Sequence, residues 1–415
     1  MIPPLHRRWR IAGPLALLLA LDFAPPILAG PGALDAAASD AHWVPTWGAA
    51  PQLTEPKNLP PAPGLAGSTL RQTVHLSIGG DRLRVRFSNA FGTGPVAIAA
   101  AAIATPGAPG AIQPDRSRPL TFGGKTAVTI APGALAVSDP VDFAVRPLSD
   151  LTITTFFGEV SRDLTGHPGA RCTSYLQPGD FISAPSLAGA VTMEHWYLLA
   201  GVEVWSEHPA GVLAILGDSI TDGRGSTTDR NRRWPDDLAR RLQADARTAG
   251  IGVLNQGIGG NRLLHDGLGP AALARLDRDV LEQNGVRWLI VFEGVNDLGT
   301  AARDQDGEVA RQIIAAYEEI IRRAHARQIR VYGATITPFG KSFYDSPARE
   351  ANRAAVNQWI RTSGRFDGVI DFDAAARDPA EPTRLAPAVD SGDHLHLSDQ
   401  GYEVLAGAVS LDGWQ

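Results

Sequence analysis

The sequence predicts a protein of two parts, in which an all-β sandwich or jelly roll over residues 42–207 precedes an α/β domain with a parallel sheet over residues 208–415. In the first part, short alternating runs are separated by Pro- and Gly-rich segments and no long helical period occurs, which is typical of sandwiches and jelly rolls. In the second part, apolar strands alternate with amphipathic helical stripes, which indicates a parallel sheet covered by helices.

In the first part, alternating runs at residues 73–78 and 83–87 flank a Gly-containing turn and predict a β-hairpin. Cys172 is the only cysteine, so no disulfide can form within the chain. It lies in an alternating stretch without a glycine elbow, which favours a packed core thiol over a nucleophile. Further strands of this part are expected at residues 127–130, 141–145 and 151–157.

In the second part, apolar residues recur every three or four positions on two expected helices. One stripe begins at Trp234 and the other at Val309, and Ser398 is the expected N-cap of a final helix. The expected strands are residues 212–216, a short one starting at 253–254, 288–292, 329–336 and 369–370.

Polar clusters follow these strands, and ligands of open parallel sheets bind at the carboxyl ends of strands. The clusters are residues 217–219, 257–262, 293–297 and 393–396. Read singly, they could be two turns, a helix cap and a salt-bridged loop. Read together, they contain the parts of a site for acyl transfer.

A serine hydroxyl becomes a nucleophile when a base takes its proton, and a histidine held by a carboxylate is such a base. Ser219, His396 and Asp393 could fill these roles, because one turn brings residues three apart into contact. The backbone N–H of Ser219, the N–H of Gly260 and the amide of Asn296 could stabilise the oxyanion that develops on the attacked carbonyl.

This arrangement resembles the SGNH hydrolases, also called the GDSL family, from residue 211 to the end of the chain. The matching residues are Ser219 in Gly-Asp-Ser-Ile, Gly260 in Ile-Gly-Gly-Asn, Asn296 in Gly-Val-Asn-Asp and His396 in Asp-His-Leu-His. Ile220 replaces the Leu of the family name, and the neighbouring Gly259 leaves open which N–H serves the oxyanion.

The resemblance implies a flavodoxin-like three-layer α/β/α fold without a cofactor or metal. It implies Ser219 as nucleophile, His396 as base and Asp393 as the carboxylate, with an oxyanion hole made by Ser219, Gly260 and Asn296. Residues 43–47, 69–73 and 86–92 resemble the β-domain that precedes the hydrolase domain in secreted bacterial members, some of which are grouped with carbohydrate esterases.

Four further residues are candidate neighbours of the catalytic groups or of the substrate. Asp218, Asp222 and Arg262 lie beside the motif blocks, where ion pairing within loops is the alternative interpretation. His167 could reach the site from the β-part or could be a structural turn histidine.

The motifs argue against two other hydrolytic mechanisms. The motif Gly-x-Ser-x-Gly is absent, which excludes the usual α/β-hydrolase elbow. A metal site of Asp393, His394 and His396 with help from Asp218 is disfavoured, because no second histidine pair occurs in this half of the chain.

The net charge and the N-terminal sequence limit which binding partners and which cellular location are expected. The net charge is −6, and no basic run occurs beyond the extreme N-terminus, which argues against a nucleic-acid partner. Arg7, Arg8 and Arg10 precede an apolar run at residues 11–21 and then small residues, as in a signal peptide, here residues 1–29. The apolar run falls short of the roughly 20 residues of a spanning helix, so no integral membrane association is expected after cleavage.

The sequence therefore predicts a secreted or periplasmic serine esterase that acts on short-chain or acetyl esters of a small molecule or polysaccharide. A lipid acyl esterase (a lipase or lysophospholipase) and an inactive glycan-binding protein are the alternatives. The sequence assigns no oligomeric state.

Overall fold

The structure is a computed structural model that describes residues 43–206, 211–301 and 307–414, all within one compact unit. The expected signal peptide at residues 1–29 lies outside the described residues, as do residues 207–209 of the expected boundary. The division into two domains there stays a prediction.

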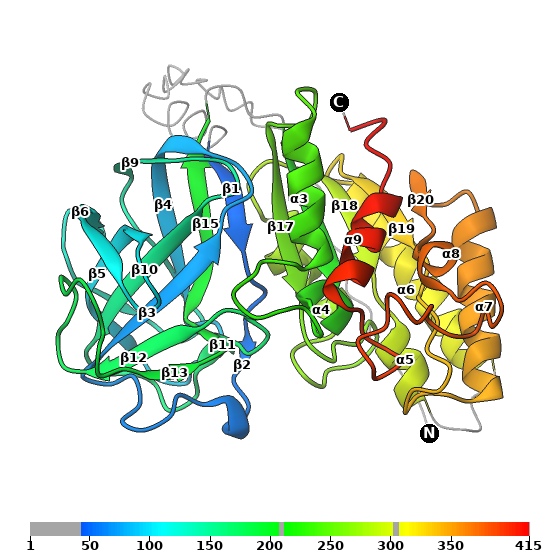
Figure 1. The fold of residues 1–415 in the computed structure, drawn as a ribbon, viewed down its shortest axis with the longest axis horizontal. Helices are drawn as coiled ribbons and strands as arrows, with labels where there is room; N and C mark the ends of the chain where they lie inside the picture. Colours follow the sequence, from blue (N-terminus) through cyan, green and yellow to red (C-terminus); the bar gives the residue numbers. More distant parts are fainter. Residues whose placement is uncertain (1–42, 207–210, 302–306, 415) are drawn as a thin grey trace, which may run out of the picture. The chain divides into compact units, whose positions relative to one another are not determined.

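Residues 43–205 form antiparallel sheets, which confirms the all-β prediction (Figure 1). The first sheet has the order β1 (Trp43–Gly48), β15 (Leu199–Trp205), β4 (Gly80–Ser88) and β8 (Leu135–Val137), with β9 (Val141–Val145) also paired to β4. The second has the order β13 (Val191–Met193), β12 (Ser174–Pro178), β3 (Ser68–His75), β10 (Asp150–Phe157), β5 (Val96–Pro106) and β6 (Ile112–Pro119), with β7 (Val128–Ile130) paired to β5. A small third sheet has the order β14 (Trp196–Tyr197), β11 (Thr165–His167) and β2 (Gln52–Leu53), and a 3₁₀ turn η1 (Pro56–Asn58) follows β2.

The predicted hairpin of residues 73–78 and 83–87 is wrong, because β3 and β4 belong to different sheets. The segment between them crosses from one sheet to the other. The N–H of Leu76 donates to the carbonyl of Ser149, and the N–H of Ser77 donates to that of Thr46, both at 2.9 Å. Alternation of apolar and polar residues along the chain identifies a strand, whereas tertiary packing determines which strand pairs with it.

The second part has one parallel sheet in the order β17 (Ile251–Gly257), β16 (Gly211–Gly217), β18 (Val286–Phe292), β19 (Arg330–Ala334) and β20 (Gly368–Ile370). Numbered along the chain, this order is 2-1-3-4-5, the flavodoxin-like order. The prediction of a parallel α/β domain is therefore confirmed.

Helices cover both faces of this sheet (Figure 1). On one face, α3 (Trp234–Ala244) packs against α9 (Asp399–Ala408), which also contacts α8 (Phe372–Ala376). On the other, α6 (Glu308–His325) packs against α7 (Pro347–Thr362), α5 (Val295–Thr300) and α4 (Ala272–Leu276), which continues into a π-helical turn η2 (Asp277–Leu281). The short helix α2 (Ser219–Asp222) follows β16 directly. No helix of the described residues is long and apolar enough to cross a membrane.

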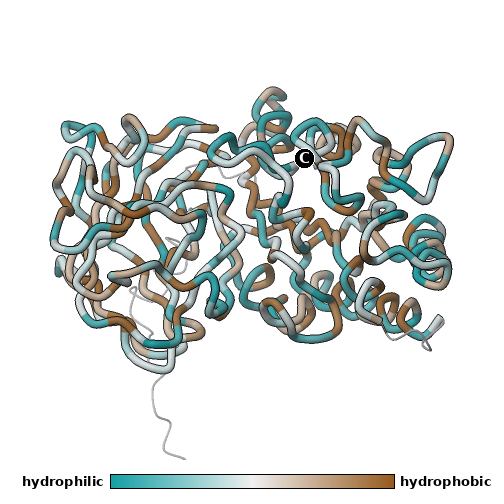
Figure 2. The backbone as a smooth tube through the Cα atoms, turned by 60° about the horizontal axis from the view of Figure 1, so that its bottom comes forward, coloured by the Kyte–Doolittle hydropathy of each residue, from teal (hydrophilic) through white to brown (hydrophobic). Residues whose placement is uncertain are grey.

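The core explains why β16 is apolar throughout. All of its residues are buried, since strands pair with it on both sides and helices cover both faces. Trp234 and Leu238 of the predicted stripe are fully buried. Burial of a large apolar side chain stabilises the folded state by about 1.5–3 kcal/mol. In Figure 2 the hydrophobic segments lie largely inside the molecule, and hydrophilic segments form many outer loops.

The two parts share one hydrophobic cluster. Strand β1 contacts β17, and the backbone N–H of Val253 in β17 donates to the hydroxyl of Ser77 at 2.9 Å. Cys172 is buried, its thiol contacts the carbonyl of Thr73, and burial raises the pKa of this thiol to about 12. Such a thiol is protonated and unreactive at neutral pH.

Candidate active site

Ser219 stands at the carboxyl end of the central strand β16, as the first residue of α2. The carboxylate of Asp218 caps this helix by accepting the N–H of Ile220 at 2.9 Å. A side chain on Gly217 would place its Cβ 2.2 Å from the hydroxyl of Thr221, so only glycine lets the helix turn back so closely over the strand. The Gly-Asp-Ser sequence thus ends the strand and starts the helix within three residues.

His396 and Asp393 come from the loop before α9, whose N-cap is Ser398 as predicted. The Nε2 atom of His396 lies 2.8 Å from the Oγ of Ser219, and its Nδ1 lies 2.6 Å from Oδ2 of Asp393. The other carboxylate oxygen of Asp393 accepts the N–H of His396 at 2.8 Å and that of Leu395 at 3.1 Å. One continuous hydrogen-bonded chain therefore joins carboxylate, imidazole and hydroxyl.

Burial and hydrogen bonding tune the two titratable groups of this chain. Partial burial raises the pKa of Asp393, but hydrogen bonds from the backbone and ring of His396 outweigh it and lower the pKa to about 2. Burial lowers the pKa of His396 below its usual 6.5, although Asp393 partly offsets this. At neutral pH, Asp393 is ionised and His396 is a neutral base.

The neighbouring His394 takes no part in this chain. Its Nδ1 lies 2.6 Å from Oδ2 of Asp390, within the same loop. No group of three or more metal-ligating side chains occurs among residues 43–206, 211–301 and 307–414.

Asn296, at the start of α5, is held in one orientation. Its Nδ2 donates to the carbonyl of Asn261 at 2.8 Å, and its Oδ1 accepts the hydroxyl of Tyr344 at 3.0 Å. The Nδ2 atom carries two N–H groups, and within the described residues only the one that donates to Asn261 has an acceptor. Tyr344 was missed by the sequence analysis, because it lies in a loop after β19 that carries no motif.

The backbone at Gly260 has φ of +71° and follows β17. Within the described part of the chain, no acceptor is found for the N–H of Ser219, of Gly259 or of Gly260. Both glycines line the cavity at Ser219, so the choice between them stays open.

Asp297 and Arg262 stabilise loops. The carboxylate of Asp297 accepts the N–H of Leu263 at 2.7 Å and that of Leu264 at 3.0 Å, which ties the loop after β17 to α5. Arg262 donates to the carbonyl of Asp266 in its own loop. The geometry therefore favours a structural role for Arg262 within its loop over contact with the catalytic groups or the substrate.

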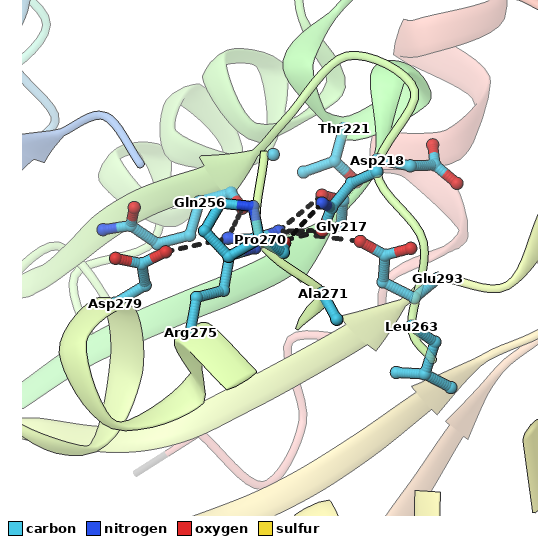
Figure 3. Close-up of polar contacts among 12 residues, drawn as sticks. Gly217, Asp218, Thr221, Gln256, Leu263, Pro270, Ala271, Arg275, Asp279 and Glu293 are labelled. Atoms are coloured by element: carbon cyan, nitrogen blue, oxygen red, sulfur yellow. Dashed lines mark hydrogen bonds and ion pairs between the residues drawn. The ribbon is translucent and has the colours of Figure 1, made fainter. Parts of the chain in front are cut away.

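Arg275 of α4 lies beneath the site and joins the ends of three strands (Figure 3). Its guanidinium donates to the carbonyls of Gly217 at 3.0 Å and Gln256 at 2.7 Å, the ends of β16 and β17. The Oε1 of Glu293, which follows β18, lies 3.6 Å away.

Arg275 also donates to Asn261 in the Gly260 loop, at 2.9 Å, and to Asp279 at 3.0 Å. Arg275, Asp279 and Glu293 are all buried, and burial raises the pKa of Glu293 well above its usual range. Burial also raises the pKa of Asp218, to about 7. The sequence analysis missed Arg275, although its position beside the buried Ala272 and Leu276 is a signal that it faces the sheet.

His167 of β11 reaches Asp222, the last residue of α2. Its Nε2 lies 2.9 Å from Oδ1 of Asp222, and its Nδ1 lies 2.9 Å from the carbonyl oxygen of Ala50. Both partners are acceptors, so a neutral ring can donate to only one of them, whereas an imidazolium could donate to both. A Cβ on Gly169 would lie 1.8 Å from Oδ2 of Asp222, so the β-part approaches the nucleophile helix as closely as glycine permits.

A cavity of about 370 Å³ opens over these groups. Ser219, His396 and Asn296 line it from the α/β part. The β-part supplies the opposite wall, with residues from the η1 turn, Arg171 and His195.

A flavodoxin-like sheet with a serine hydrogen-bonded to a histidine at its carboxyl edge defines a class, the serine ester hydrolases. Residues 215–404 match the model of the GDSL-like Lipase/Acylhydrolase family. The α/β part of this chain therefore belongs to that family, and the chain is a serine ester hydrolase. A search of curated proteins finds no match.

Several solved structures are similar to this chain over 48% of its length. They include a lipolytic protein of the G-D-S-L family from Desulfitobacterium hafniense DCB-2, with 18% identity, TM-score 0.38 and 97% of that chain covered. A catalytic mutant of an acetylxylan esterase from Geobacillus stearothermophilus has 21% identity, TM-score 0.38 and 92% covered. A carbohydrate acetylesterase from Sinorhizobium meliloti has 15% identity, TM-score 0.37 and 95% covered.

Proposed function

We propose that the protein is a secreted esterase that removes short acyl groups, acetyl above all, from carbohydrate by way of an acyl-enzyme on Ser219. The observation that carries this proposal is the chain of hydrogen bonds from Asp393 through His396 to Ser219, with distances of 2.6 and 2.8 Å. The signal-peptide pattern of residues 1–29 supports export.

In the proposed acylation step, Nε2 of His396 takes the proton of Ser219 as Oγ bonds to the ester carbonyl carbon. The carbonyl oxygen becomes an oxyanion, for which the N–H groups of Ser219 and Gly260 and the Nδ2 of Asn296 are the donors. His396 then gives its proton to the leaving alcohol as the C–O bond breaks. Asp393 stays ionised and stabilises the imidazolium.

In deacylation, His396 takes a proton from water, whose oxygen attacks the acyl carbon. The ester bond to Ser219 breaks, the serine regains its proton from His396, and the free acid leaves. Protons and electrons balance without an added group.

A small acyl group on a polar alcohol fits the cavity better than a long chain. The volume of about 370 Å³ lies near the lower end of ligand pockets. The wall contributed by the β-part is polar, with Gln52, Lys57 and Asn58 among its residues.

A lipid acyl ester is the second candidate substrate. Phe343 and Leu268 line the cavity and are 70% and 44% exposed, which is unusual for large apolar side chains and would suit contact with an acyl chain.

The test is a panel of p-nitrophenyl esters from C2 to C16 together with acetylated xylan, assayed with the wild type and with Ser219→Ala. A preference for C2 with release of acetate from the polymer supports the proposal. A preference for long chains supports the lipid alternative. If Ser219→Ala keeps most of the activity, the mechanism is wrong, and if the wild type binds xylan without turnover, it is a glycan-binding protein.

A further inference from the structure

Three basic residues, Lys57, Arg171 and Arg224, line the cavity that contains Ser219. They come from distant parts of the chain: the η1 turn, the segment before β12, and the loop after α2. The chain as a whole carries a net charge of −6, so this concentration of positive charge is local.

The acidic side chains of the same cavity already have partners. The two carboxylate oxygens of Glu55 accept from Gln52 at 2.7 Å and from Asn58 at 2.9 Å. Asp222 accepts from His167 at 2.9 Å. Neither carboxylate is hydrogen-bonded to one of the three cations.

The side chains of the three basic residues have N–H groups that are available to donate hydrogen bonds. Within the described ranges, the side chains of Lys57 and Arg224 have no hydrogen bond or ion pair, and both residues are exposed. Arg171 forms an ion pair with Asp222, with Nη2 and Oδ2 3.7 Å apart, but no hydrogen bond joins them, and within the described residues the buried Nε of Arg171 has no hydrogen-bond partner.

Arg171 is held in place by its backbone. It has a φ of +49°, and its carbonyl accepts the N–H of Asp229 at 3.0 Å. The carboxylate of Asp229 in turn accepts the N–H and the hydroxyl of Thr173, at 2.6 and 2.7 Å. A guanidinium so anchored and only 26% exposed is preorganised for an anion.

Arg171 and Arg224 line the cavity together with His396. Their positive charges also lower the pKa of His396, after burial as the main cause. In the proposed reaction, His396 gives its proton to the departing alcohol. An alcohol that receives this proton lies in the cavity that the two arginines line.

We propose that the alcohol portion of the substrate carries an anionic group, the carboxylate of an acidic sugar, which Arg171 binds with support from Arg224 and Lys57. This inference rests on the proposed function, because it assigns the alcohol side of the same reaction. A cavity of about 370 Å³ holds a sugar unit, whereas the long chain of a lysophospholipid would extend outside it.

The first experiment uses two acetate esters that differ only in charge on the alcohol side, 4-carboxyphenyl acetate and its methyl ester. The quantity measured is the ratio of kcat/KM for the anionic ester to that for the neutral ester. Comparing this ratio between wild type and variants cancels the intrinsic reactivity of the two phenols. Arg171→Gln and Arg224→Gln each lower the ratio, Arg171→Gln by about 10-fold, as expected for loss of a hydrogen bond to a charged group.

The matched control is Arg327→Gln. Arg327 is exposed, as Arg224 is, but it lies just before β19, at the opposite edge of the sheet from Ser219. Arg327→Gln changes the net charge by the same amount as the test variants. In this control the ratio of kcat/KM for the two esters stays at the wild-type value. Salt gives a second readout: the wild-type ratio falls between about 0.01 M and about 1 M salt, where the Debye length shrinks from about 30 Å to about 3 Å.

The second experiment measures acetate release from O-acetylated polygalacturonate and from the same polymer with its carboxylates methyl-esterified. Faster release from the free-acid polymer, lost in Arg171→Gln, supports the inference. Equal release from both, or faster fatty-acid release from a lysophospholipid, overturns it.

The outcomes also separate this inference from the proposed function. If the wild type hydrolyses both esters and the ratio is unchanged in Arg171→Gln, the inference fails and the esterase mechanism stands. If it hydrolyses neither ester, both fail.

Discussion

The α/β part and the β-part contribute to the cavity in different ways. Ser219, Asn296 and His396 each follow an apolar strand or stand before a helix of the α/β part, within recognisable motifs. From the β-part, His167 contacts Asp222 and Arg171 lines the cavity, and neither lies in a recognisable motif.

In the proposed reaction, the groups that make and break bonds lie in motifs, whereas the groups proposed to bind the substrate do not. The reactive groups sit where a parallel sheet must end its strands, so the fold brings them together. The residues of the β-part act through close packing onto α2 and through charge. Substitutions in the α/β part should therefore have larger effects on kcat than substitutions in the β-part.

The largest effect is expected from Asp393→Asn, in the α/β part. Asparagine cannot stabilise the imidazolium of His396, and kcat should fall by about 10⁴-fold. Its Oδ1 can still accept the two backbone N–H groups, so the free energy of unfolding should change little. The control is Asp390→Asn, which alters the neighbouring pair with His394 and should leave kcat near the wild-type value. Equal losses in both variants would contradict the assignment.

Arg275→Met should lower the free energy of unfolding by about 3–5 kcal/mol, because it leaves the carbonyls of Gly217 and Gln256 without their buried donor and removes one of the two arginines that pair with Asp279. Urea unfolding followed by tryptophan fluorescence measures this. The exposed pair of Arg322 and Glu319 provides the control, since Arg322→Met should not shift the midpoint detectably. A stable Arg275→Met protein with wild-type kcat would show that the strand ends do not need this tie.

Asn296→Ala should reduce kcat by about 10²–10³-fold, as for removal of one oxyanion donor. Tyr344→Phe removes only the hydroxyl that orients Asn296 and should cost less than about 10-fold, in kcat more than in KM. Steady-state kinetics on p-nitrophenyl acetate distinguishes the two. A larger loss in Tyr344→Phe than in Asn296→Ala would reverse their proposed roles.

His167→Gln tests the contribution of the β-part directly. Glutamine cannot reach Ala50 and Asp222 at once from the ring positions, so α2 loses one anchor and kcat should fall by about 10-fold. The control is His75→Gln, which breaks a more exposed pair with Asp150, 2.6 Å long, and should leave kcat unchanged. No loss in His167→Gln would mean that the β-part only holds substrate.

The smallest effect expected is on the pH profile. The pKa of His396 is lowered, so its neutral form persists as pH falls through 6.5. The kcat/KM should stay near its plateau at pH 6.5 and fall tenfold per pH unit only below the lowered pKa. Asp393, with a pKa of about 2, stays ionised across that range. An acid limb centred above pH 6.5 would contradict this burial effect.

Much of the α/β part could be predicted from its sequence. The unbroken apolarity of β16 and β18, and helical stripes such as that of α6, are local patterns that survive packing. Ser219 and His396 are 177 residues apart in the sequence, yet Oγ of Ser219 lies 2.8 Å from Nε2 of His396. Both residues lie at the same edge of the parallel sheet, and the strand–helix alternation constrains the strand order of that sheet.

The β-part was predictable only as a set of strands. The runs of β3 and β4 were expected to pair, but each pairs with strands distant in the chain, because alternation gives the face of a strand and not its partner.

The sequence by itself determined the strands, the helix stripes and the motif residues at the strand ends, because periodicity and motifs are local properties of the chain. The tertiary structure alone decided that Arg275 would join three strand ends, that His167 would hold Asp222 and that Arg171 would face the cavity. These contacts depend on which surfaces pack together, and nothing in the residues next to each side chain specifies its partner.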